Sequence, residues 1–217
     1  MMQSILRIKR ESNLGGLLLM LGALIILITI GFEYRIGWIG VKRPASEVPL
    51  FIFQKWDRLQ VIWGWQCIGF FLQTIAYVLL LKNSSNSFKS LLWSLLALLG
   101  LLIVIAFGIT LGSYGPALDV YETQPELFHS FRGAVRSLYS PGLLGLVFLT
   151  IIYLIETFSA NGLINRKWGL VGFALVLLGI VLSFVPGLPG KTIGAVIFFV
   201  PLFVGYGYWN QTEKYNH

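Results

Sequence analysis

Long runs of apolar residues, separated by short polar segments, dominate the chain. A helix rises about 1.5 Å per residue, so roughly 20 apolar residues cross a hydrocarbon core about 30 Å thick. The runs are continuously apolar and do not alternate with period two, which favours helices over strands. We predict six membrane-spanning helices, at residues 14–31, 61–81, 91–111, 139–158, 168–185 and 193–209.

Polar and proline-containing turns separate these segments. Residues 82–89, KNSSNSFK, are few enough to join the second and third runs only as an antiparallel hairpin. Residues 186–190, PGLPG, divide the fifth run from the sixth, because proline cannot continue a helix without losing a backbone hydrogen bond. Pro201 lies within the sixth run, where we expect a kink. The predicted fold is an all-α, polytopic transmembrane helical bundle that forms one integral membrane domain, residues 1–217.

The composition agrees with lipid as the main solvent of the chain. Hydrophobic residues make up 56% of the 217 positions and charged residues 12%, which leaves too little polar surface to coat a soluble globule. The net charge of +7 comes from Lys and Arg spread along the connectors, not from one basic stripe. This spread disfavours nucleic acid as a partner and indicates membrane lipids with anionic headgroups.

The first apolar run also sets the expected orientation. The Lys and Arg of the whole chain divide evenly between the two sides, so the three basic residues that precede this run, Arg7, Lys9 and Arg10, decide the orientation. The run is long and has no small-x-small cleavage site after Ile30, so we interpret it as a retained signal anchor. We therefore expect the N-terminus and the C-terminus inside.

Two connectors, residues 32–60 and 112–138, are longer than a turn and face outward in this orientation. In the second, Thr123 and Glu126 have the spacing of a capping box, with Pro125 in the first helical turn. The apolar residues that follow recur at three- and four-residue spacing, which predicts a short interfacial helix in the third connector. These residues are Leu127, Phe128, Phe131, Val135 and Leu138.

The polar face of that helix carries the first candidate site. His129, Arg132 and Arg136 are suited to an anionic ligand or lipid headgroup, because arginine presents paired donors to phosphate and carboxylate. The alternative is that these side chains reach water while the apolar face is buried.

The ends of the first outer connector also carry charged residues. Glu33 and Arg35 follow the first span, and Lys55, Asp57 and Arg58 precede the second. Arg58 joins the candidates for an anionic ligand or lipid headgroup, with structural pairing as the alternative.

Polar side chains inside the spans are few, and three of them are candidates for function. Gln73 and Thr74 lie in the second span, and Glu156 lies near the inner end of the fourth. An acid at that depth suits a proton relay. The alternative is a solvated helix end bordering Arg166 and Lys167.

Several kinds of chemistry find no support in the sequence. Cys67 is the single cysteine, one of the two histidines is the terminal His217, and no phosphate-binding glycine loop or nucleophile elbow is present. We expect no metal and no cofactor. Gly108 and Gly112 form a small-xxx-small pattern, and we expect them to pack against another helix of the molecule.

Residues 162–172, GLINRKWGLVG, lead into the fifth span. Together with the layout of six spans and longer first and third connectors, this stretch resembles an uncharacterised family of six-span bacterial membrane proteins, a domain of unknown function. The resemblance implies a helical bundle in the bacterial cytoplasmic membrane and carries over no catalytic residues.

Three functions remain open at this point. The leading one is a non-enzymatic accessory or interaction subunit that packs against a larger membrane complex or binds lipid through its outer loops. The second is a small transporter or channel, which needs a wet path lined by the polar side chains of the spans or the Pro201 kink. The third is an intramembrane enzyme acting on a lipid-linked substrate, with His129 as acid or base beside the two arginines.

Overall fold

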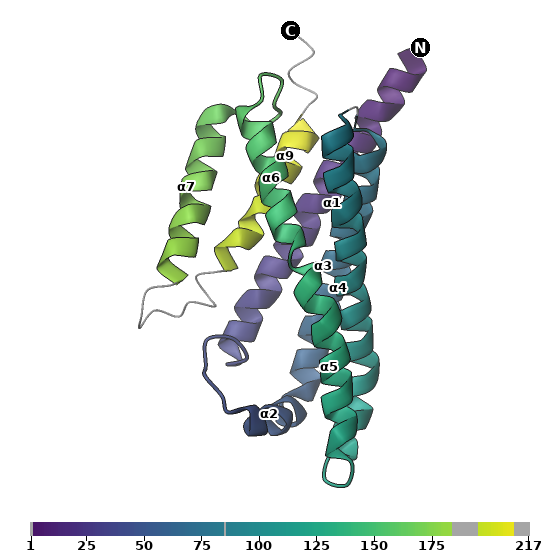
Figure 1. The fold of residues 1–217 in the computed structure, drawn as a ribbon, viewed down its shortest axis with the longest axis vertical. Coiled ribbons are helices and arrows are strands. Elements are labelled where there is room, and N and C mark those ends of the chain that lie inside the picture. The colour runs from purple at the N-terminus through teal and green to yellow at the C-terminus, as the bar shows by residue number, and fades with distance from the viewer. Residues whose placement is uncertain (1, 85, 184–194, 211–217) are drawn as a thin grey trace.

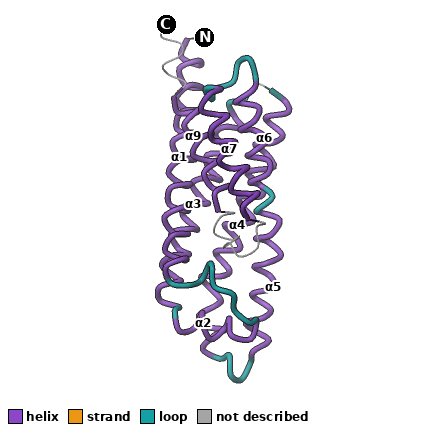
Figure 2. Tube along the Cα trace, turned by 90° about the vertical axis from the view of Figure 1, so that its left-hand side faces the viewer, coloured by secondary structure: helices purple, strands orange, loops and turns teal. Residues whose placement is uncertain are grey.

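The computed structural model describes residues 2–84, 86–183 and 195–210, and this part of the chain is all helical, without strands. The helices run along one long axis (Figure 1), and the tube in Figure 2 shows the same elongated bundle from the side. The elements are α1 (Met2–Arg35), η1 (Ala45–Glu47), α2 (Val48–Gln54), α3 (Trp56–Lys82), α4 (Ser87–Asp119), α5 (Pro125–Gly142), α6 (Gly145–Phe158), α7 (Arg166–Ser183), η2 (Ala195–Phe199) and α9 (Val200–Trp209).

Four helical stretches are long and apolar enough to cross a membrane: Glu11–Arg35, Trp56–Lys82, Ser87–Asp119 and Pro125–Phe158. They contain the first four predicted spans. The fifth corresponds to α7 as far as residue 183, and the sixth to the shorter apolar helix Val196–Trp209. The turn at 186–190 lies outside the described residues, so the structure supports four spans and does not confirm six.

Helix α1 occupies the middle of the bundle, between α3 and α9, while α4 packs on α3 and α5 packs on α4 (Figure 1). The start of α1, the turn from α3 to α4 and the end of α9 lie at one end, which we call the N-terminal end. The end of α1, the short helix α2 and the turn from α4 to α5 lie at the opposite end.

Two aromatic-rich clusters form the core. The first surrounds Trp93 and Tyr153 toward the N-terminal end, and the second surrounds Trp63, Phe107 and Phe128 toward the opposite end. Large apolar side chains also face outward all along the helices. Such an outer surface suits lipid, because polar and charged side chains are costly in contact with hydrocarbon.

Close backbone contacts between helices are made at glycines of α1. A Cβ on Gly22 would lie 2.5 Å from the carbonyl oxygen of Gly69 on α3, and one on Gly16 would lie 2.6 Å from that of Gly205 on α9. The prediction for Gly108 and Gly112 was wrong, because both are exposed and have no neighbour within 4 Å of a built Cβ. Their face of α4 points away from the other helices.

The third connector is much shorter than predicted. Helix α4 continues to Asp119 and α5 begins at Pro125, so only residues 120–124 connect them. The predicted helix start at Pro125 is confirmed. The predicted interfacial helix is not confirmed, because the apolar face of α5 packs along α4, with the Phe128 and Tyr114 ring centroids 5.0 Å apart, and α5 leads on into α6 (Figure 1).

One local detail of the prediction was wrong. Thr123 does not cap α5, since its hydroxyl donates to the Val120 carbonyl at 3.1 Å, and the N-cap residue is Gln124. Pro201 lies in the first turn of α9, directly after the 3-10 turn Ala195–Phe199, where a missing backbone N–H breaks no α-helical hydrogen bond.

Candidate functional site

A groove of about 880 Å³ lies between α1 and α3 at the opposite end of the bundle. The last three turns of α1 form one wall and the first three turns of α3 form the other. Its lining divides into a charged rim and an apolar wall, and the residues are Ile25, Ile28, Thr29, Phe32, Arg35, Ile36, Lys55, Asp57, Arg58, Val61, Ile62 and Trp65.

The rim is basic. Arg35 ends α1, Lys55 is the N-cap residue of α3, and Arg58 lies in the first turn of α3 beside Asp57. Arg35, Asp57 and Arg58 are exposed and Lys55 is half-buried. No ion pair within 4.0 Å involves any of them in the part of the chain that the structure describes, so three cations outnumber one acid and the rim has a net positive charge.

Local structure places the rim beside the end of α1. The helical conformation is interrupted at Lys55, between α2 and α3. The backbone N–H of Lys55 donates to the carbonyls of Phe51 and Ile52. The N–H of Arg58 then donates to the Lys55 carbonyl at 3.1 Å and starts α3. The change of direction at Lys55 places the first turn of α3 next to the last turn of α1.

The wall below the rim is apolar and open. Ile28 and Phe32 follow the α1 side toward Arg35 at helical spacing, and Val61 and Trp65 follow Arg58 on the α3 side. All four are exposed, with Val61 61% and Ile28 59% accessible. Thr29 adds little polarity, because its hydroxyl donates to the carbonyls of Ile25 and Ile26 at 2.8 Å.

The predicted anion-binding residues do not converge on one site. Arg58 lies in the groove, whereas Arg132 is half-buried and lines a second cavity on the other side of α1 and α3. Arg136 is exposed. His129 is exposed too, with its Nε2 3.4 Å from the Tyr121 hydroxyl and its ring against Phe128. The sequence showed Arg35 and Lys55 near the ends of two spans, but only the structure shows that both line one groove.

The candidate polar residues of the spans also lie apart. Gln73 is buried and accepts a hydrogen bond from the Tyr77 hydroxyl at 3.3 Å, and the Thr74 hydroxyl donates to the Phe70 carbonyl at 2.8 Å. Both belong to α3 near its middle, far along the chain from Glu156 on α6.

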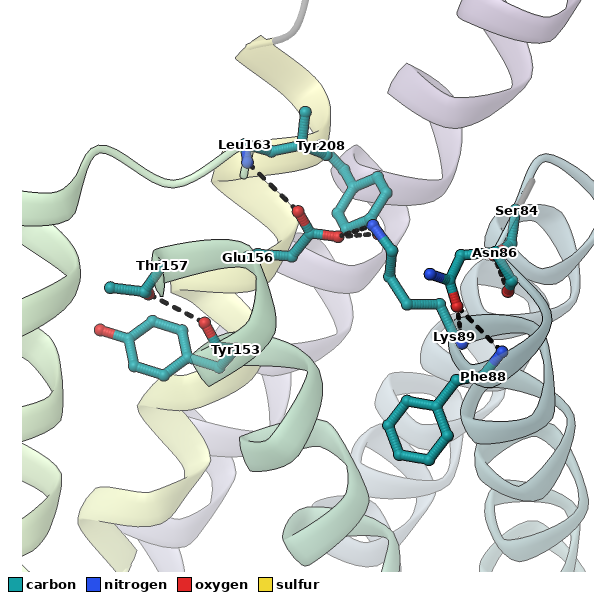
Figure 3. A network of polar contacts seen from close by, with 9 residues as sticks. All are labelled: Ser84, Asn86, Phe88, Lys89, Tyr153, Glu156, Thr157, Leu163 and Tyr208. Atoms are coloured by element: carbon teal, nitrogen blue, oxygen red, sulfur yellow. Dashed lines mark hydrogen bonds and ion pairs between the residues drawn. The ribbon is translucent and has the colours of Figure 1, made fainter. Parts of the chain in front are cut away.

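Glu156 is fully buried in a network of three donors (Figure 3). Lys89 Nζ lies 2.9 Å from its Oε1, the Tyr208 hydroxyl donates to the same oxygen at 2.7 Å, and the Leu163 N–H donates to Oε2 at 3.2 Å. The expected solvated helix end was therefore wrong, and the ionic partner is Lys89, not Arg166 or Lys167. The sequence signal for Lys89 was only its place at the start of a span.

Within the described ranges, no group of three or more His, Cys, Asp and Glu side chains is placed to hold a metal ion. Comparison of the chain with protein-family models, with curated proteins and with solved structures found no match in any of the three.

Proposed function

We propose that this chain is a non-enzymatic integral membrane protein that binds an anionic phospholipid in the groove between α1 and α3. The observation that carries the proposal is the basic rim of Arg35, Lys55 and Arg58 directly above an exposed apolar wall. A phospholipid has the same division, a phosphate at the membrane surface and an acyl chain below it.

The chemistry of each part suits such a lipid. Guanidinium groups bind phosphate oxygens through paired hydrogen bonds, and each Lys or Arg near an anionic surface contributes about 1 kcal/mol to binding. The acyl chain gains contact with Phe32 and Trp65, and an indole ring favours the headgroup level. Asp57 on the rim disfavours a second negative charge close to it, which suits a headgroup with one net charge.

We further propose six spans in a bacterial cytoplasmic membrane with the N-terminus and C-terminus inside, so that the groove opens in the outer leaflet. The support for the orientation is the basic Arg7, Lys9 and Arg10 before the first span. The support for the membrane is the resemblance of residues 162–172, and we propose that α7 and the apolar helix Val196–Trp209 belong to the fifth and sixth spans.

Native mass spectrometry tests the lipid proposal. The protein is purified in mild detergent, exposed to equal amounts of phosphatidylglycerol and phosphatidylcholine, and released from the micelle. We expect the wild type to retain phosphatidylglycerol preferentially. The double variant Arg35→Gln/Arg58→Gln should weaken that retention roughly 30-fold, because it loses two contributions of about 1 kcal/mol each.

Arg136→Gln is the matched control, since Arg136 is exposed but lies on α5 outside the groove. It should retain phosphatidylglycerol like the wild type. Equal retention by the double variant, or an equal loss in Arg136→Gln, contradicts a lipid site in this groove. A preference for phosphatidylcholine contradicts the charge argument.

A further inference from the structure

A second cavity of about 370 Å³ lies on the other side of α1 and α3 from the groove, where residues of α4 and α5 complete its lining. It shares no lining residue with the groove, so it is a separate site. Most of its wall is apolar, and aromatic rings contribute a large part of it: Trp38, Trp63, Phe70, Phe107, Tyr114 and Tyr139.

A carboxylate stands in this wall. Glu33, in the last turn of α1, is 5% exposed, and the Trp63 Nε1–H donates to its Oε1 at 2.7 Å. The Gln66 side chain also hydrogen-bonds this carboxylate, so Glu33 has two neutral donors and, among the described residues, no cationic partner within 4.0 Å. The ammonium group of a ligand would supply the counter-charge that these donors do not provide.

A guanidinium group lines the same cavity from α5. Arg132 is half-buried there, in the same lining as Tyr114 and Tyr139. No ion pair within 4.0 Å joins it to Glu33, and the structure describes both residues. The cavity therefore carries one group of each charge, contributed by helices far apart in the sequence and not neutralising each other by direct contact.

We propose that this cavity binds a small zwitterion with an apolar body, of the amino-acid class. The ammonium group of the ligand lies toward Glu33, its acid group lies toward Arg132, and its apolar body packs against the rings. The nearby rings of Trp38 and Trp63, 5.5 Å apart at their centroids, add a cation–π surface for the ammonium group.

The size of the cavity limits the ligand. Ligand cavities commonly measure roughly 300–1,000 Å³, and this one lies near the lower limit. It suits a molecule with one ring or a short chain, and it is too small for a phospholipid with two acyl chains. The proposal is independent of lipid binding in the groove.

Three probes of nearly equal shape test the charges separately: L-phenylalanine, phenethylamine, which lacks the carboxylate, and 3-phenylpropionate, which lacks the ammonium group. Isothermal titration calorimetry on the purified protein in detergent measures each Kd. We expect phenylalanine to bind at least about tenfold more tightly than either single-charge analogue, because each analogue leaves one wall charge unpaired.

Two variants then assign the partners. Glu33→Gln should weaken phenylalanine and phenethylamine about tenfold and leave phenylpropionate unchanged, whereas Arg132→Gln should weaken phenylalanine and phenylpropionate and leave phenethylamine unchanged. Arg136→Gln, one turn further along α5 and outside the cavity, is the control and should bind like the wild type.

The probe series in the wild type keeps the test decisive if Glu33→Gln does not fold. Absence of saturable phenylalanine binding overturns the proposal, as does binding of phenethylamine as tight as that of phenylalanine, which indicates a site for a simple cation. Loss of phosphatidylglycerol retention in Arg35→Gln/Arg58→Gln with unchanged phenylalanine binding shows that the two sites are distinct. Loss of phenylalanine binding in Arg132→Gln with unchanged phosphatidylglycerol retention shows the same.

Discussion

At the scale of single residues, the Lys89–Glu156 pair is the strongest polar interaction among the contacts described above. Both carboxylate oxygens of Glu156 accept hydrogen bonds, and the Lys89 side chain is only 26% exposed. Removing one partner of a buried pair leaves the other charged or polar group without compensation, which costs about 3–5 kcal/mol. The pair ties α4 to α6, and Tyr208 adds α9 to the same network (Figure 3).

We predict that Lys89→Met lowers the free energy of unfolding by about 3 kcal/mol, because it leaves the buried Glu156 without its cation. Unfolding by sodium dodecyl sulfate in mixed micelles, followed by circular dichroism, measures the change. Lys82→Met is the matched control. Lys82 forms a more exposed pair with Glu11 at 3.4 Å, and its loss should cost less than about 1 kcal/mol. Equal losses for the two variants contradict this account.

The sequence indicated which residues are chemically capable but not which of them meet. Arg58 and Arg132 were both selected by type and by position near a span, and the structure places them in different sites. The partner of Glu156 lies 67 positions away in the chain. A contact of that separation depends on how helices pack, and hydrophobic periodicity in one segment carries no information about the neighbouring segment.

At the scale of helices, the glycines of α1 decide how closely it packs with its neighbours. Without strong hydrophobic attraction between helices in lipid, close backbone contact is a main source of association. Gly22 meets the Gly69 backbone on α3, and that contact holds together the helix pair that forms the groove.

We predict that Gly22→Ala destabilises the protein by about 1–3 kcal/mol, because its Cβ would lie 2.5 Å from the Gly69 carbonyl oxygen and would force α1 and α3 apart. Gly31→Ala on the same helix is the control. Nothing lies within 4 Å of a Cβ there, and alanine favours the helix by about 1 kcal/mol, so this variant should be neutral or slightly stabilised. The same unfolding titration compares both, and a stable Gly22→Ala variant rules out tight packing at this crossing.

The predicted helices agree best with the observed ones where an apolar run ends in a clearly polar turn. Helices α3 and α4 contain the second and third predicted spans, and Asn86 caps α4 by accepting from the N–H groups of Phe88 and Lys89. The prediction of the third connector was wrong because the apolar run ends near residue 111, whereas helix α4 continues to Asp119. Residues 112–119 continue α4 through Pro116, since contact with α5 stabilises a helix there without a membrane-length apolar run.

At the scale of the whole molecule, the two hairpin turns lie at opposite ends of the bundle (Figure 1). The turn between α3 and α4 includes Asn83 and Asn86, and the turn between α4 and α5 spans residues 120–124. A single span, α4, separates them. The proposed orientation therefore places the first turn inside and the second outside.

Cysteine labelling in intact cells tests this orientation. With Cys67, the single cysteine of the sequence, replaced by serine, we predict that Glu122→Cys reacts with a membrane-impermeant maleimide and that Asn86→Cys reacts only after the cells are opened. Both positions are exposed, so a difference in reactivity reports sidedness. The reverse pattern contradicts the orientation, and labelling of both in intact cells contradicts a transmembrane α4.

The 33 residues of α4 have a further practical consequence, since they extend about 50 Å and exceed a hydrocarbon core about 30 Å thick. Part of the α4–α5 pair must therefore extend beyond the hydrocarbon core. Electron cryomicroscopy of a chain of only 24.3 kDa needs an added mass held at a fixed angle to align its particles. A small rigid protein inserted at residues 120–124 would move with the bundle and supply that landmark.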